Sequence, residues 1–132
     1  MANVNLTQLV SKLNETCRNS LESAAGFCLS RTNYNVEIEH WLMKILERPN
    51  TDLTTIFKHF DVDQSRLIAD LTKTIDGFKT GNARSPALSP ALVEAMQNAW
   101  LYSSVEFTSH TVRTGHLLYA LLTGRDPGNL YF

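Results

Sequence analysis

The sequence predicts an all-α fold of two related helical units plus an added N-terminal helix, and three observations predict it. Residues 36–46 return as residues 112–122 at a constant shift of 76 positions, and upstream residues match at a shift of 75. Apolar residues recur at spacings of three and four along most of the chain, as on helices. No segment alternates apolar and polar residues with the period of two that marks a strand.

The first helical stripe begins close to the N-terminus. Its members are Leu6, Leu9, Val10, Leu13, Cys17, Leu21 and Ala24. Asn5 followed by Gln8 resembles a capping box, so the first helix is predicted to begin near Leu6. Asn14 can cap a new helix or lie on the solvated face of a continuous one. We favour a short helix to Leu13 and a second one over residues 15–30.

The rest of the first unit contains three more predicted helices. After a polar connection at residues 31–35, an apolar face runs from Ile38 to Leu46 and stops before Pro49. Thr51 or Asp52 can cap the next helix. A further helix is expected between Asp63, as its cap, and Gly77, near its end.

A second unit follows after an exposed linker at residues 78–87. Ser89 is predicted to cap a helix with Pro90 at its first position, where the missing N–H has no cost. A polar connection at residues 103–111 then leads into the second copy of the repeated helix, which ends near Thr123. We therefore expect one domain over residues 1–132, with its first repeat at about 14–77 and its second at about 88–124.

The composition is that of an ordinary globular protein. The chain has 132 residues, 43% hydrophobic and 19% charged, a length that suits one domain. Its net charge of -1 and the lack of a basic stripe argue against a nucleic-acid partner. Neither a bilayer-spanning apolar run nor a signal-peptide pattern occurs, so we expect a cytoplasmic protein that binds no membrane.

No pattern for nucleotide or metal binding is present, so no metal or cofactor is expected in this chain. The phosphate loop that ends in Gly-Lys-Ser/Thr is missing. The four histidines are not spaced as ligands on one helical turn, and two cysteines do not complete a zinc set. On one helix Cys17 and Cys28 would lie about 16 Å apart. Because bridged α-carbons lie roughly 6 Å apart, we expect two free, buried thiols whose pKa values are raised.

His40 and His116 occupy the same position in the repeated segment. A residue that recurs in both units is expected to perform the same packing or capping task twice, and we favour this interpretation over a catalytic or metal-binding one. Glu37 and Glu39 stand where the first copy begins. We interpret them as carboxylates at the positive end of a helix dipole, in preference to an acid–base pair.

The double helical unit, with an apolar residue, three intervening positions, His and a following Leu, resembles the N-terminal domain of the Clp or Hsp100 AAA+ unfoldases. The resemblance is closest to the ClpV branch, the ATPases of bacterial type VI secretion systems. It covers nearly all of residues 4–124. The segments that carry it are residues 9–14, Cys17 and residues 20–24, 39–42 and 84–89.

The resemblance implies a substrate-recognition domain, tethered in a full-length homohexamer to two ATPase rings that bind ATP and Mg²⁺. The implied substrate is the contracted sheath of the secretion system, held through the N-terminal helix of its VipB (TssC) subunit. The motor would thread that subunit, disassemble the sheath and allow its reuse. The alternative is a general Clp N-domain that docks adaptors or unfolded segments. The isolated domain is expected to be a monomer.

An amphipathic ligand helix requires an apolar groove. The leading stripe can pack wholly on its own core or form one wall of such a groove, and the resemblance implies that the added first helix takes part. The predicted peptide-binding wall consists of Leu6, Leu9, Val10, Leu13, Pro86, Ala87 and Leu88. A third hypothesis, a small helical enzyme with a reactive cysteine or histidine, requires a thiol of low pKa.

The C-terminus departs from the family pattern. In the family, further helices normally follow the repeated one, whereas here Gly124 begins a Gly- and Pro-containing tail. Residues 125–132 are expected to be a truncated end or the remnant of a cleaved tag, because residues 129–132 resemble such a remnant. Missing helices would leave apolar surface of the second unit exposed.

Overall fold

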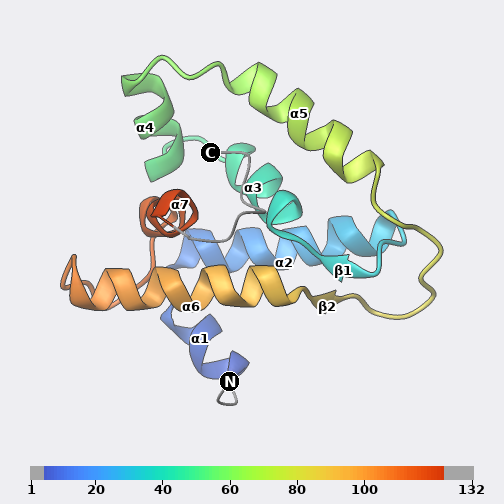
Figure 1. Ribbon diagram of the computed structural model, residues 1–132, viewed down its shortest axis with the longest axis horizontal. Helices are drawn as coiled ribbons and strands as arrows, with labels where there is room; N and C mark the ends of the chain where they lie inside the picture. The colour runs from blue at the N-terminus through green and yellow to red at the C-terminus, as the bar shows by residue number, and fades with distance from the viewer. Residues whose placement is uncertain (1–4, 124–132) are drawn as a thin grey trace.

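The computed structural model describes residues 5–123, whose regular secondary structure is almost entirely α-helical (Figure 1). The all-α prediction is therefore confirmed, while the predicted tail at residues 125–132 lies outside the described residues. The elements follow one another as α1 (Leu6–Lys12), α2 (Glu15–Ser30), β1 (Asn35–Val36), α3 (Ile38–Leu46), α4 (Asp52–His59), α5 (Gln64–Asp76), β2 (Ala87–Leu88), α6 (Pro90–Val105) and α7 (Thr114–Thr123).

Short polar side chains fix where the helices begin. In five helices the N-cap side chain accepts a hydrogen bond from the amide three residues on, and these caps are Asn5, Asn14, Thr51, Asp63 and Ser89. Asn14 therefore separates two helices, as predicted. Pro90 occupies the first position of α6, as also predicted.

Two very short strands are the exception to the helical prediction. β1 pairs with β2 in parallel, Val36 lies opposite Leu88, and the Ser89 N–H donates to the Val36 carbonyl at 3.0 Å. The expectation of no strands was wrong for these residues. A strand of two residues shows no alternation in the sequence, because only its partner, here the connection that enters α6, defines it.

A second parallel pairing of two extended segments reflects the internal symmetry of the chain. We call each of these two pairings a backbone crossing. Leu13 forms a parallel bridge with Val112, and the Asn14 N–H donates to the Val112 carbonyl at 2.8 Å. In the sequence repeat, Leu13 matches Leu88 and Val112 matches Val36. The Leu13–Val112 pairing is thus the counterpart of the Leu88–Val36 pairing, with the two units exchanged. An approximate twofold axis therefore relates the two units.

The core lies between the paired helices of the two units. α2 packs on α3 and α6 packs on α7, while α2 and α6 run in opposite directions in Figure 1. Trp41 is fully buried, and its indole Nε1–H donates to the Cys17 carbonyl at 3.1 Å. Cys17 and Cys28 share α2 and are buried and free, so the predicted absence of a disulfide between them is confirmed.

The first unit continues beyond its paired helices. α4 packs against α7 of the other unit, and α5 packs against α3, where it forms the upper edge of the molecule in Figure 1. The connection after α5 is mostly exposed but tied down. The Asn82 N–H donates to the Thr32 carbonyl at 2.9 Å, and the Asn33 Nδ2–H donates to the Lys79 carbonyl at 3.1 Å.

The repeated histidines perform one task twice, as predicted. His40 Nδ1 accepts the Glu37 N–H at 2.9 Å, and His116 Nδ1 accepts the Arg113 N–H at 3.0 Å. Each ring thereby satisfies an amide that a helix N-terminus leaves unpaired. Both histidines are capping residues of the helix that follows a backbone crossing.

Candidate binding groove beside the first helix

Helix α1 lies outside the two repeated units. In Figure 1 it extends below α6, against which it packs. Leu9 and Leu13 face the core and are 9% and 2% exposed, whereas Leu6 keeps 42% of its surface exposed and Val10 is half-buried. The leading stripe is thus divided between the core and an open surface.

Backbone hydrogen bonds hold the C-terminal end of α1 in place. The Val112 N–H donates to the Lys12 carbonyl at 2.7 Å, and the neighbouring Asn14 N–H returns to the Val112 carbonyl. Such bonds do not depend on side-chain identity at these positions. They hold the C-terminal end of α1 against the connection between α6 and α7.

A cavity of about 430 Å³ lies between α1 and the C-terminal half of α6. Both helices contribute residues at spacings of three and four over two turns, so one face of each helix lines it. The lining residues are Asn5, Gln8, Leu9, Lys12, Gln97, Trp100, Leu101 and Ser104. Leu9, Trp100 and Leu101 supply apolar surface, and amide and hydroxyl groups surround it.

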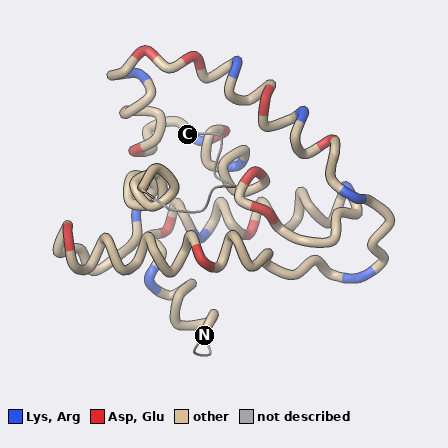
Figure 2. Tube along the Cα trace, viewed as in Figure 1, with Lys and Arg blue, Asp and Glu red and all other residues tan. Residues whose placement is uncertain are grey.

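Exposed apolar surface continues beyond this cavity along α6. Leu101 is 55% exposed, and Val105, one turn further on, is 70% exposed. The two helices carry little charge, since Lys12 is the one charged residue of α1 and Glu94 the one charged residue of α6 (Figure 2). Apolar surface rimmed by polar groups is typical of a protein-binding site.

The structure does not bring the residues of the predicted peptide-binding wall together at one site. Leu9 lines the cavity, while Leu13 is buried at the crossing with Val112. At 3.6 residues per turn, Leu6 and Val10 lie on the flank of α1 away from the cavity.

The second part of the predicted wall precedes α6. Pro86 and Leu88 are half-buried, and Ala87 is exposed. The cavity lies at the C-terminal half of α6, so the structure does not bring these three residues into its lining. They lie toward the other end of that helix (Figure 1).

Sequence reasoning missed Gln97, Leu101 and Ser104. Trp100 also lines the cavity and was not among the predicted site residues. A signal was present in the sequence, because Leu101 and Val105 are both apolar and lie one turn apart on the helix predicted after Ser89. An apolar pair at a spacing of four on the outer face of a helix indicates a second contact surface.

The thiols and the buried imidazole have pKa values that oppose reactivity. Burial, with a smaller contribution from Asp52, raises the pKa of Cys17 to about 12. Burial also raises the pKa of Cys28 and lowers that of His40 to about 4. The enzyme hypothesis required a thiol of low pKa, and both thiols shift the opposite way.

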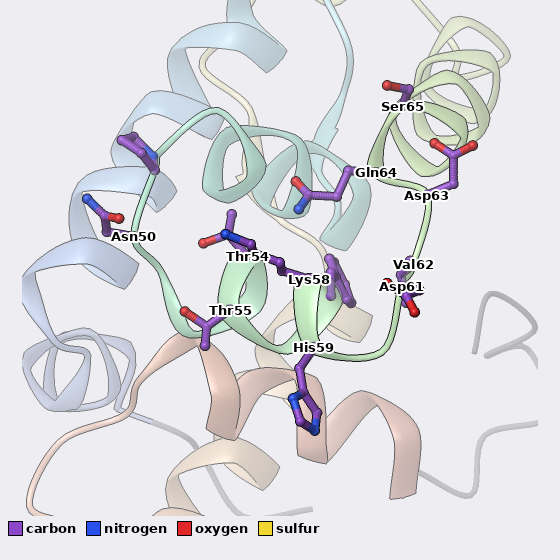
Figure 3. Close-up of a pocket in the computed structure, with 12 residues that line it drawn as sticks. Asn50, Thr54, Thr55, Lys58, His59, Asp61, Val62, Asp63, Gln64 and Ser65 are labelled. Atoms are coloured by element: carbon purple, nitrogen blue, oxygen red, sulfur yellow. The ribbon is translucent and has the colours of Figure 1, made fainter.

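Other hollows lie on the surface of the described residues, among them a wide one and a more apolar one. The wide one, of about 1000 Å³, has a mixed polar and apolar lining from α4, the turn before it and the start of α5, including Asn50, Thr54 and Gln64 (Figure 3). The more apolar one, of about 520 Å³, lies between α4 and α7 beside Phe107 and Leu122, which are 48% and 53% exposed.

Neither membrane-spanning nor metal-binding features occur in the described part of the chain. Within residues 5–123, no helix combines the length and apolar character needed to cross a bilayer. The same residues contain no group of three or more His, Cys, Asp or Glu side chains placed to hold a metal ion.

Known proteins share the sequence and the architecture of this chain. The AAA+ ATPase ClpV1 of Pseudomonas aeruginosa is 35% identical over 122 residues, which are 92% of this chain and 14% of that protein. The chain therefore spans a small part of this relative's length.

Solved structures share the fold, and two of them are informative here. The N-domain of ClpV from Vibrio cholerae superposes with a TM-score of 0.86 at 32% identity, over 93% of this chain and 74% of the other. A complex of a ClpV N-domain with a VipB peptide superposes with a TM-score of 0.82 at 31% identity, over 96% of this chain and 77% of the other.

A family profile agrees with both the sequence repeat and the structure. Residues 12–130 match the family described as the Clp repeat (R) N-terminal domain. This match covers most of the chain and includes both helical units. The chain therefore belongs to the Clp repeat (R) N-terminal domain family.

Proposed function

We propose that this chain is the substrate-recognition domain of a hexameric AAA+ unfoldase of a type VI secretion system. Its substrate is the N-terminal helix of the sheath subunit, VipB or TssC, which it holds beside α1. The observation that carries this proposal is the open apolar groove between α1 and α6, in a domain that superposes on a ClpV N-domain complexed with a VipB peptide.

The groove suits a helix better than a small molecule. Its apolar side chains follow two turns of α1 and α6, so an amphipathic helix can lay an apolar face along it. Each Å² of apolar area buried contributes about 25 cal/mol, against an association cost of about 4–15 kcal/mol. A single domain should therefore bind modestly, and a hexamer facing many sheath subunits gains affinity through avidity.

In this mechanism, one part of the protein binds the substrate and another part pulls on it. This domain holds the sheath helix, and AAA+ modules outside this chain bind ATP and Mg²⁺ and thread the subunit, so contracted sheaths are disassembled and recycled. The domain itself needs no cofactor. The isolated domain is a monomer, and the full-length protein is a homohexamer in the bacterial cytoplasm.

The predicted wall supplies a second contact region in this proposal. Leu6 and Val10 lie on the flank of α1 away from the cavity, and Pro86, Ala87 and Leu88 precede α6. Variants on each flank therefore separate their contributions.

The test is a titration of the purified domain with a labelled N-terminal peptide of the sheath subunit from the same secretion system. Leu101 lines the groove and is 55% exposed, so Leu101→Asp places a charge on the surface that the ligand would cover. This substitution should weaken binding at least about tenfold. Leu29→Asp is the matched control, because Leu29 is 50% exposed on α2 and should leave the affinity unchanged. Equal affinity of wild type and Leu101→Asp would remove the cavity from the site.

Leu6→Asp tests the other flank, since Leu6 is 42% exposed and can change without unfolding the core. Weakening by Leu6→Asp alone would place the ligand against the flank of α1 that carries Leu6 and Val10. Leu9→Asp is unsuitable, because Leu9 is buried and a carboxylate there would destabilise the fold itself.

The alternative function is a general Clp N-domain that docks adaptors or unfolded segments, and membership of the family favours it. The two functions differ in selectivity. If an unfolded protein without the sheath sequence competes as well as unlabelled sheath peptide, the general function is supported. If it competes only at much higher concentration, the sheath function is supported.

A further inference from the structure

The groove beside α1 has one charged side chain. Of its eight lining residues only Lys12 carries a charge, and the others are apolar, amide or hydroxyl residues. The Lys12 ammonium lies 5.0 Å from the centre of the Trp100 ring, in the range of a cation–π contact. A positive charge therefore stands beside the apolar surface at a defined place.

The position of this charge is set by the backbone as well as by the ring. The Lys12 carbonyl accepts the Val112 N–H at 2.7 Å, so the last turn of α1 cannot shift freely. None of the ion pairs within residues 5–123 involves Lys12. Its ammonium can thus receive a carboxylate from a ligand without breaking an ion pair inside the described fold.

We propose that Lys12 is a specificity-determining residue that selects a ligand helix bearing an Asp or Glu next to its apolar face. The carboxylate pairs with the ammonium while the apolar face covers Leu9, Trp100 and Leu101. This inference rests on the proposed function, since it names the feature by which the same groove recognises the helix that it binds. A helix that is merely apolar would leave the charge of Lys12 partly buried and unpaired, which disfavours it.

A purely structural role for Lys12 makes a different prediction. A cation in the last turn of α1 interacts favourably with the negative end of the helix dipole, and its stem covers part of Trp100. If that were its whole role, removing Lys12 would change stability but not the ligand's preference for an acidic residue. The experiment therefore measures preference in addition to affinity.

The probe is the N-terminal peptide of the sheath subunit, with each Asp or Glu changed in turn to Gln and to Lys. Each peptide is titrated into wild type, Lys12→Met and Lys12→Glu. At one position, the change to Gln should weaken binding to wild type about fivefold and leave binding to Lys12→Met unchanged. At the same position, the Lys-bearing peptide should bind Lys12→Glu more tightly than it binds wild type.

The control is Lys73→Met on the exposed face of α5, which should keep the wild-type preference at every position. Wild-type binding that no acidic substitution weakens would overturn the role of Lys12 and leave the proposed function standing. Equal loss on substitution in wild type and Lys12→Met would also overturn it. Absence of any wild-type binding would instead overturn the proposed function and this inference with it.

Discussion

The two units use the same histidine for the same cap but bury it to different depths. His40 is fully buried between the rings of Phe27 and Phe78, and its Nε2 lies 3.1 Å from Asn33 Oδ1. His116 is half-buried, and its ring lies beside Phe107, which is 48% exposed. The cap is therefore a local property of the repeated sequence, whereas burial depends on what the rest of each unit places over it.

The largest expected effect on stability comes from replacing each of these histidines in turn with alanine. His40→Ala removes a cap, leaves a cavity and removes the hydrogen bond to the buried Asn33 Oδ1, so we expect it to lower the free energy of unfolding by about 3 kcal/mol. His116→Ala should cost about 1 kcal/mol, because its site is more exposed. Urea denaturation of both variants measures the difference. Equal costs would show that burial does not distinguish the two units.

The same difference predicts acid sensitivity. Burial lowers the pKa of His40 from 6.5 to about 4, so between these values the unfolded chain binds a proton that the folded chain does not. The free energy of unfolding should therefore fall as the pH drops from about 7 to about 4, by roughly 3 kcal/mol from His40.

Urea denaturation at several pH values tests this assignment. In His40→Ala the fall over the same pH window should be smaller by about the amount that His40 contributes. His116→Ala should change the pH profile less, since burial lowers the pKa of His116 in the same direction but the residue is more exposed. A wild-type pH profile retained in His40→Ala would exclude His40 as its cause.

A smaller effect separates the units at Ser20, whose counterpart in the repeat is Ala95. Ser20 Oγ is buried and finds no hydrogen-bond partner within residues 5–123. Ser20→Ala should therefore raise the free energy of unfolding by about 1 kcal/mol, and the reverse change Ala95→Ser should lower it. Thermal unfolding of both variants checks the sign. A destabilised Ser20→Ala would mean that the hydroxyl has a hydrogen-bond partner, such as a buried water.

Much of the fold could be predicted because its signals are local. The caps at Asn14 and Ser89 and the repeated histidines lie within a few residues of the amides they satisfy. The backbone crossings could not be predicted, since Leu13 and Val112 are distant in sequence and pair through main-chain atoms alone. No side-chain pattern encodes such a pairing.

The binding site was harder to predict than the fold. Helical spacing showed which residues share a face of α1 but not which of them the core would bury, and Leu9 and Leu13 were used for packing. The opposite wall, at Trp100 and Leu101, belongs to a helix for which the sequence predicted only the cap and the first position. A site formed between two helices depends on how they pack, which neither helix shows alone.

The central claim, that a sheath helix binds between α1 and α6, can be tested without any substitution. The chain has two tryptophans, Trp41 in the core and Trp100 at the cavity. In a ¹⁵N-correlated NMR titration with the sheath peptide, the indole N–H signal of Trp100 should move until saturation, while that of Trp41 stays in place. Saturable binding that leaves the Trp100 signal unmoved would contradict the claim.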